Sequence, residues 1–168
     1  SIVYRGGFEA DFTAPSLHLQ TVDLFGLNTL PLSGSVSATL KASGTFDRPE
    51  MHAAVTILHL EGAGQPLGGG QVVVDVVDRR VRLTASLDEQ HARLEATLRW
   101  EPDFPVSAVF TVEDGSLVPL IRPWLPAALA EMTAVVSGRL ALEGPLRAPL
   151  RWRVETRLSR LSADVGEY

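Results

Sequence analysis

Apolar and polar side chains alternate along most of this chain. In RVRLTASLD, residues 80–88, Val81, Leu83, Ala85 and Leu87 are separated by polar residues, and SVSATLKAS, ARLEATLRWE and LRWRVETRL show the same pattern. Successive side chains of a β-strand point to opposite faces, so each stretch can form a strand with one apolar and one polar face. The pattern predicts a mainly β protein of about ten strands that follow one another as an antiparallel meander.

The connections between the expected strands are mostly short and polar. Asp78-Arg79 and Glu89-Gln90 each lie between two alternating stretches, which predicts two hairpins. Residues 61–70, EGAGQPLGGG, are rich in glycine, and we expect a longer, flexible link there.

One segment departs from the period of two. In residues 114–132, DGSLVPLIRPWLPAALAEM, apolar residues recur at helical spacing after Ser116, which is a suitable N-cap. Pro119, Pro123 and Pro126 interrupt this spacing. We therefore expect one short, broken helical segment near residues 116–131, whose apolar face covers one end of the sheet.

The chain contains two versions of one passage. SGTFDRPEMHAAVTILHL begins at residue 43 and EGPLRAPLRWRVETRLSRL begins at residue 143, and Gly44 and Pro49 have the same spacing as Gly144 and Pro149. A Ser-Gly pair precedes each version, at residues 33–34 and 137–138. Repeated strand-rich units typically stack side by side and bury a continuous apolar face. We expect approximate units at 1–113 and 114–168, the second incomplete, within a single fragment (1–168) of a longer protein.

Composition excludes several classes of function. The 168 residues have a formal net charge of −5 without a basic stripe, which argues against nucleic-acid binding. The chain has no cysteine, so it can form neither disulfides nor thiolate metal sites. No apolar run approaches the ~18 residues that a membrane-spanning helix needs.

The polar residues show no pattern typical of an active site. His18, His52, His59 and His91 lack the spacing of metal ligands, and a regular strand would point His52 and His59 to opposite faces. Residues 88–91, DEQH, are more typical of a polar hairpin tip than of a cation site. The glycine-rich stretch lacks the Lys-Ser/Thr of a phosphate-binding loop, and no Gly-x-Ser-x-Gly motif occurs. We expect a protein that is not an enzyme, with no catalytic residues, no metal and no cofactor.

The apolar stripe is the remaining candidate site, although alternation alone is more typical of an ordinary sandwich or barrel core that a second sheet closes. SGSVSATLKASGTFDRPEMHAAVTI resembles the repeat of the TamB (translocation and assembly module) proteins and their AsmA-like relatives, through Gly34, Gly44, Thr45, Phe46 and Pro49. Residues 117–149 resemble the short helix and next copy of that family, through the following matches: Leu117, Leu120, Leu125, Pro126, Gly138, Leu140, Gly144 and Pro149. Pro145 replaces the usual threonine, so we expect the second turn to differ locally.

The resemblance implies a curved, elongated antiparallel sheet, a half-pipe or "β-taco", with an apolar inner face. It implies a periplasmic bridge, anchored in the inner membrane of a diderm bacterium, that carries phospholipid toward the outer membrane and works with a BamA-like (TamA-type) barrel partner in outer-membrane biogenesis. Phospholipid acyl chains would then contact a groove lined by Val36, Leu40, Val55, Ile57, Val72, Val74, Leu83, Leu87, Leu94, Leu98, Phe110, Val112, Leu140, Leu142, Trp152 and Val154.

Two other functions fit the same pattern. The protein could be an assembly scaffold whose sheet edge accepts a client strand by β-augmentation, or a plain β-sandwich interaction domain. A raw sheet edge and an exposed trough also favour a homodimer or stacking between copies. An apolar face that lies open favours the lipid bridge, and a covered one favours the sandwich.

Overall fold

The computed structural model describes residues 7–18, 32–45, 47–62, 65–116 and 133–164. These residues form one antiparallel sheet of nine strands whose spatial order is the order of the sequence. The strands are β1 (Gly7–His18), β2 (Leu32–Thr45), β3 (Arg48–Gly62), β4 (Gln65–Val77), β5 (Arg80–Leu87), β6 (Ala92–Arg99), β7 (Pro105–Gly115), β8 (Thr133–Pro145) and β9 (Arg153–Asp164). A single turn of 3-10 helix, η5 (Pro149–Arg151), precedes β9.

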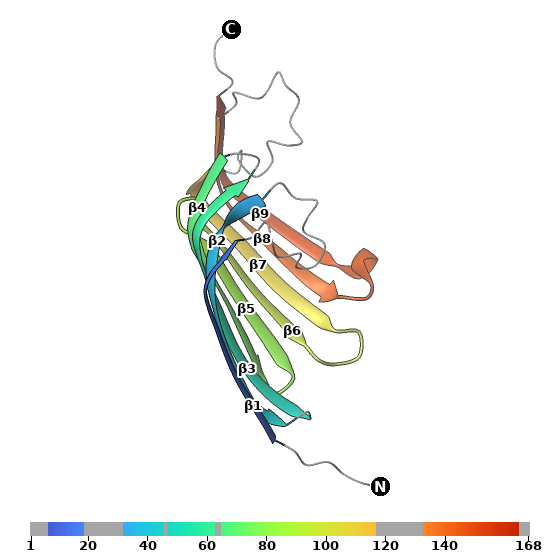
Figure 1. Cartoon of the computed structure of the whole chain (residues 1–168). Helices are drawn as coiled ribbons and strands as arrows, with labels where there is room; N and C mark the ends of the chain where they lie inside the picture. The colour runs from blue at the N-terminus through green and yellow to red at the C-terminus, as the bar shows by residue number, and fades with distance from the viewer. Residues whose placement is uncertain (1–6, 19–31, 46, 63–64, 117–132, 165–168) are drawn as a thin grey trace.

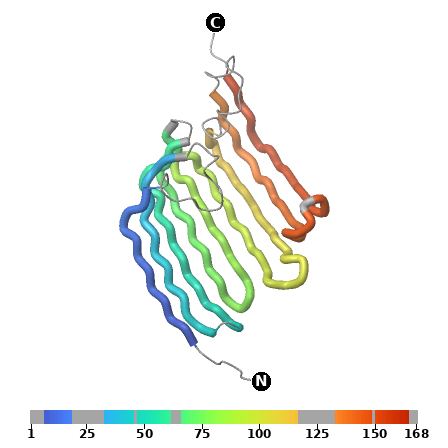
Figure 2. Tube along the Cα trace, turned by 45° about the vertical axis from the view of Figure 1, so that its right-hand side comes forward, coloured from blue at the N-terminus to red at the C-terminus, as the bar shows by residue number. Residues whose placement is uncertain are grey.

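The sheet is twisted and curved, and it remains open at both sides (Figures 1 and 2). In the described part of the chain, β1 pairs only with β2, and β9 pairs only with β8. The expected mainly β, curved antiparallel sheet is therefore confirmed. The helical segment expected near residues 116–131 falls almost entirely outside the described residues.

Two of the expected hairpins are present. Asp78 and Arg79 join β4 to β5 with φ angles of 48° and 61°, and positive φ at both central residues is typical of a tight hairpin turn. Residues 88–91 join β5 to β6, and the backbone N–H of His91 donates to the carbonyl of Asp88 at 3.1 Å. Both turns connect neighbouring strands directly, which keeps the meander compact.

The expectation of a flexible link at residues 61–70 is wrong. β3 continues to Gly62 and β4 begins at Gln65, so most of this glycine-rich stretch belongs to two paired strands. Gly70 lies opposite Leu87 of β5, and a Cβ at Gly70 would collide with the backbone carbonyl of Ser86. Glycine is used here because β4 and β5 approach each other closely, not because the chain is loose.

The strand register supports the internal repeat. Phe12 lies opposite Leu40 in the β1–β2 pair, and Phe110 lies opposite Leu140 in the β7–β8 pair. Equally far along the two pairs, Gly44 lies opposite Phe8, and Gly144 lies opposite Val106. β7, β8 and β9 thus repeat β1, β2 and β3. The matching stretch therefore begins at the start of β7, ahead of the expected unit boundary at residue 114.

The register also corrects one detail of the repeat. Gly138 lies opposite Val112, which is the position that Ala38 occupies opposite Ala14 in the first copy. The two Ser-Gly pairs therefore do not occupy equivalent positions, because Gly138 corresponds to Ala38 when the copies are aligned at Gly44 and Gly144.

The second turn differs from the first, as the proline at position 145 predicted. In the first copy Gly44 pairs directly with Pro49. In the second copy Pro149 lies in η5, and the regular pairing resumes at Arg153, opposite Glu143.

Candidate functional site

One face of the sheet consists almost entirely of apolar side chains. Residues directly opposite each other on paired strands point to the same face, so the register defines continuous rows from β1 to β9. Row 1 contains Ala10, Ala42, Met51, Val76, Val81, Leu98, Val106 and Gly144. Row 2 contains Phe12, Leu40, Ala53, Val74, Leu83, Ala96, Ala108, Leu142 and Val154.

Two further rows continue this face toward the other end of the strands. Row 3 contains Ala14, Ala38, Val55, Val72, Ala85, Leu94, Phe110, Leu140 and Thr156. Row 4 contains Leu17, Val36, Ile57, Gly70, Leu87, Ala92, Val112, Gly138 and Leu158. The four rows contain no charged side chain, and Thr156 is their one polar residue.

The middle of this face is not covered by another described element. Every residue of rows 2 and 3 apart from Ala14 is half-buried or exposed, including Leu94 and Phe110 near the centre of the sheet. A packed second layer would bury such side chains. Row 4 is more buried, since Val36 and Val112 have only 6% and 4% of their surface exposed.

The apolar face is large and is lower near its centre. Nine strands about 4.8 Å apart span roughly 38 Å, and rows 1 to 4 extend about 20 Å along the strands. Ala96 and Ala108 are neighbours in row 2, between Leu83 and Leu142. These two small side chains lower the face locally between bulkier neighbours.

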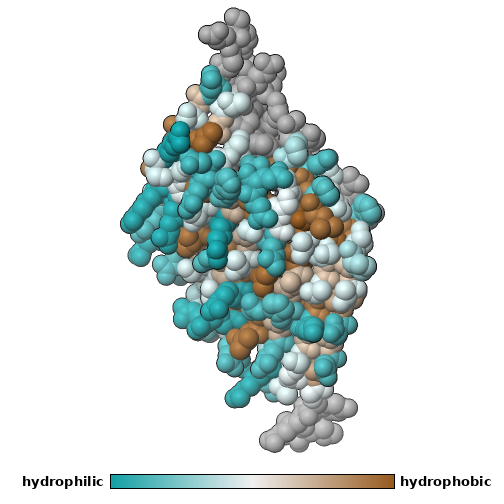
Figure 3. Space-filling model, turned by 90° about the vertical axis from the view of Figure 1, so that its left-hand side faces the viewer, coloured by the Kyte–Doolittle hydropathy of each residue, from teal (hydrophilic) through white to brown (hydrophobic). Residues whose placement is uncertain are grey.

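The opposite face is charged and hydrophilic. Asp11, Lys41, His52 and Asp75 lie side by side on β1 to β4. The Lys41 ammonium lies 3.8 Å from the Asp11 carboxylate, and His52 Nδ1 lies 2.6 Å from Asp75 Oδ1. Figure 3 shows this hydrophilic character over the side that bows outward in Figure 1, so the apolar rows line the concave side.

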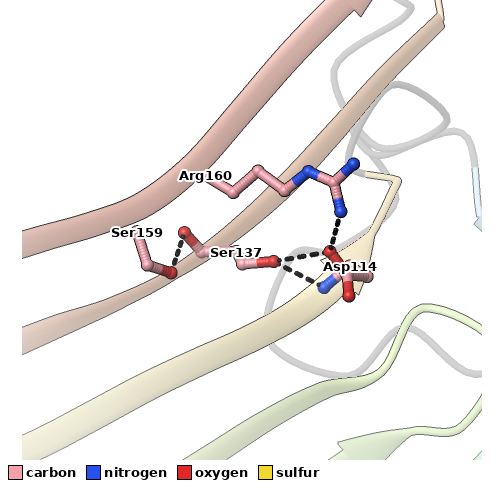
Figure 4. Close-up of polar contacts among 4 residues, drawn as sticks. All are labelled: Asp114, Ser137, Ser159 and Arg160. Atoms are coloured by element: carbon pink, nitrogen blue, oxygen red, sulfur yellow. Dashed lines mark hydrogen bonds and ion pairs between the residues drawn. The ribbon is translucent and has the colours of Figure 1, made fainter.

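A polar cluster connects the last three strands. Ser137 Oγ of β8 donates to Asp114 Oδ1 at 3.0 Å and accepts from the backbone N–H of Asp114 at 2.8 Å. Arg160 of β9 donates to the same carboxylate oxygen at 3.1 Å, and Ser159 Oγ donates to the carbonyl of Ser137 at 2.9 Å. As Figure 4 shows, the four side chains gather where β9 bulges, between Ser137 and Gly138 in the register. The cluster ties β7, β8 and β9 together at the bulge.

All but one of the residues predicted to line a groove belong to the rows of the apolar face. Fifteen of the sixteen belong to rows 1 to 4. The remaining one, Trp152, lies just before β9 against Gly144, and its indole N–H donates to the carbonyl of Pro145 at 2.7 Å. Their contact with lipid stays a prediction.

The prediction omitted several members of the same face. Phe12 of β1 was missed, although residues 7–18 contain an alternation of apolar and polar side chains around it. Met51, Val76 and Val81 continue the parity of neighbours that were predicted, so the two-residue period alone could have found them.

The described residues offer little to other kinds of site. None of their His, Asp and Glu side chains form a group of three that could hold a metal ion. No helix in the described ranges is long and apolar enough to cross a membrane. Comparisons with family models, curated proteins and solved structures returned no match to this chain.

Proposed function

We propose that this chain is a segment of a periplasmic bridge that carries phospholipid acyl chains along its apolar sheet face between the inner and outer membranes. The observation that carries the proposal is the set of four apolar rows, three of which cross all nine strands, with rows 2 and 3 uncovered by any described element. Monomeric proteins seldom expose apolar patches above about 300–600 Å². The four rows have a footprint of roughly 38 by 20 Å, and an apolar face of this extent without a described second layer favours an apolar ligand.

The chemistry of the face suits a chain of methylene groups. Removing one methylene from water is worth about 0.8 kcal/mol, so an acyl chain needs no specific polar contact in order to bind. The two small side chains at Ala96 and Ala108 lower the face locally, where such a chain could pack more closely. A charged headgroup would find no partner among rows 1 to 4. It would therefore remain in solvent, away from the concave apolar face.

The internal repeat supports transport rather than binding at one point. A conduit needs the same apolar cross-section along its whole length, and the register of β1–β3 recurs in β7–β9 with apolar residues at most of the equivalent positions, Thr156 in place of Ala53 being the exception. The TamB resemblance adds to this proposal a parent protein that is anchored in the inner membrane, has no enzymatic activity and has a BamA-like barrel partner. A sandwich domain would instead require a second layer over Leu94 and Phe110, which are half-buried in this single sheet.

The test compares a charge on each face of β6. Leu94→Arg places a guanidinium in row 3, where its long side chain can extend toward the open side, so the protein should fold with a modest loss of stability. Acyl chains would then have to pass a desolvated charge, and lipid binding should be lost. The matched control is Glu95→Arg on the opposite face, which removes only an exposed ion pair to Arg93 at 2.9 Å and should leave lipid binding unchanged.

The measurement combines thermal melting with photo-crosslinking of phospholipid to a photoreactive amino acid placed at Leu83 or Leu94. Crosslinks at both positions, lost in Leu94→Arg and retained in Glu95→Arg, are the expected result. If Leu94→Arg fails to fold and neither position crosslinks, the face is a closed core and the proposal fails.

A further inference from the structure

We propose that β9 is the contact surface of a symmetric dimer, in which β9 of a second copy of this chain pairs with it in antiparallel orientation. Among the described residues β9 pairs only with β8, and all twelve of its residues are exposed. The free N–H and C=O groups of such an edge are a template for another strand. This inference concerns an edge of the 168-residue chain rather than its apolar face, so it does not rest on the proposed lipid function; further strands of a longer parent protein would compete with the second copy for this edge.

The apolar side chains of β9 support this contact. Val154, Leu158 and Leu161 are 58%, 56% and 63% exposed, which is unusual for large apolar residues of a strand. In an antiparallel pairing centred on Thr156, Val154 of each copy lies opposite Leu158 of the other. Both pairs lie on the concave side, so the two apolar faces join into one.

The charged side chains support the same register. Centring on Thr156 places Glu155 of each copy opposite Arg157 of the other, which gives two ion pairs by symmetry. Within its own sheet Arg157 lies opposite Arg139, and no described carboxylate forms an ion pair with either of them. Glu155 of the second copy would therefore relieve an existing repulsion between like charges.

The other edge of the sheet is unsuited to the same contact. On β1, Glu9 and Asp11 point to the hydrophilic face, opposite Ser43 and Lys41. A symmetric pairing of β1 centred on Ala10 would place Glu9 of each copy opposite Asp11 of the other, which is unfavourable. Self-complementary contacts generate closed two-fold dimers, the commonest form of oligomer, and the charges that flank Thr156 on β9 are self-complementary.

The bulge limits how far the pairing extends. Ser159 is the extra residue of the bulge, and Arg160 is held by Asp114 at 3.1 Å. The regular part of β9 therefore ends near Ser159, and the symmetric contact covers residues 153–159 of each copy.

Charge reversal tests the register. Sedimentation velocity of the 168-residue chain should show a dimer, and Glu155→Arg or Arg157→Glu alone should raise its dissociation constant about tenfold or more, because each creates two like-charge pairs. The double variant E155R/R157E restores opposite charges at both pairs and should recover the dimer. Circular dichroism confirms that each variant folds, which these exposed positions should permit.

Crosslinking provides a second test. The chain has no cysteine, so Thr156→Cys introduces a single thiol that meets its own counterpart at the two-fold axis. Directly opposite residues of an antiparallel pair lie about 4.5–5.5 Å apart between Cα atoms, within the range of a disulfide. Oxidation should give a covalent dimer, whereas Thr39→Cys, exposed on the inner strand β2, should not. A monomer at all concentrations, or a dimer that is insensitive to the charge reversals and is not linked through position 156, would overturn the inference.

Discussion

Single glycines set the geometry of the two matching turns. Gly44 has a φ of 107°, and a Cβ there would collide with the backbone carbonyl of Arg48. Gly144 has no positive φ, but a Cβ there would lie 2.6 Å from the Trp152 ring. The same residue type thus serves two physical purposes, a backbone conformation in the first turn and room for an aromatic ring in the second.

Gly44→Ala should therefore destabilise the protein by about 1–3 kcal/mol, because alanine is strained at this φ and its methyl group has no space. Urea unfolding followed by circular dichroism measures the change. Gly7→Ala is the matched control on the neighbouring strand, since its Cβ would make an ordinary contact of 3.4 Å with the carbonyl of Gly44. Equal stability of the two variants would show that the turn at Gly44 relaxes freely.

At the scale of the strand, alternation predicted the elements well because the side-chain period of a paired strand is fixed by the backbone. Parity fails where a bulge intervenes, because a bulge is set by pairing with another strand. His59 pairs with Ser35, and Ile57 with Val36, so Leu58 is the extra residue. His59 therefore shares the hydrophilic face with His52, which lies opposite Lys41; the expectation that they face opposite sides is wrong.

The residues of the apolar face were predictable for the same reason, since the period of two fixes which side chains of a regular strand share a face. What the sequence could not supply is the alignment of neighbouring strands. That alignment places Ala96 beside Ala108, and Gly138 opposite Val112. It depends on turn lengths and on the bulges, and neither follows from local spacing.

The cluster at the second bulge should stabilise the β8–β9 pair. Ser137→Ala removes both hydrogen bonds to Asp114 and should cost about 1 kcal/mol, a modest value because the groups are partly in solvent. Hydrogen exchange should speed up in residues 153–164. The matched control is Ser107→Ala on β7. The Ser107 side chain is exposed and its hydroxyl makes no hydrogen bond to another described residue, so this variant should change neither quantity. Unchanged exchange in β9 for Ser137→Ala would mean that main-chain pairing alone holds the bulge.

At the scale of the whole molecule, the sheet is a one-dimensional array. Each strand pairs only with its neighbours in sequence, and the described residues provide no second layer that would connect distant strands. Stability of such an array is approximately a sum over adjacent pairs, as in repeat proteins. The same property suits a conduit, because units can be added without changing the cross-section of the ones already present.

This architecture predicts that the sheet opens from its sides. Strands β4 to β6 have partners on both sides and are joined by short turns, whereas β1 and β9 are bonded on one side only. Native-state hydrogen exchange in low urea should therefore show the strongest amide protection in β4–β6, with protection falling stepwise toward both edges, because local opening needs fewer contacts to break there.

Pairing of β9 in the proposed dimer adds a neighbour on one side. Protection of β9 should accordingly rise with protein concentration in the native chain but not in Glu155→Arg, while that of β1 stays constant. Uniform protection across all nine strands at every concentration would indicate one cooperative, closed core, and it would contradict both the open sheet face and the edge contact.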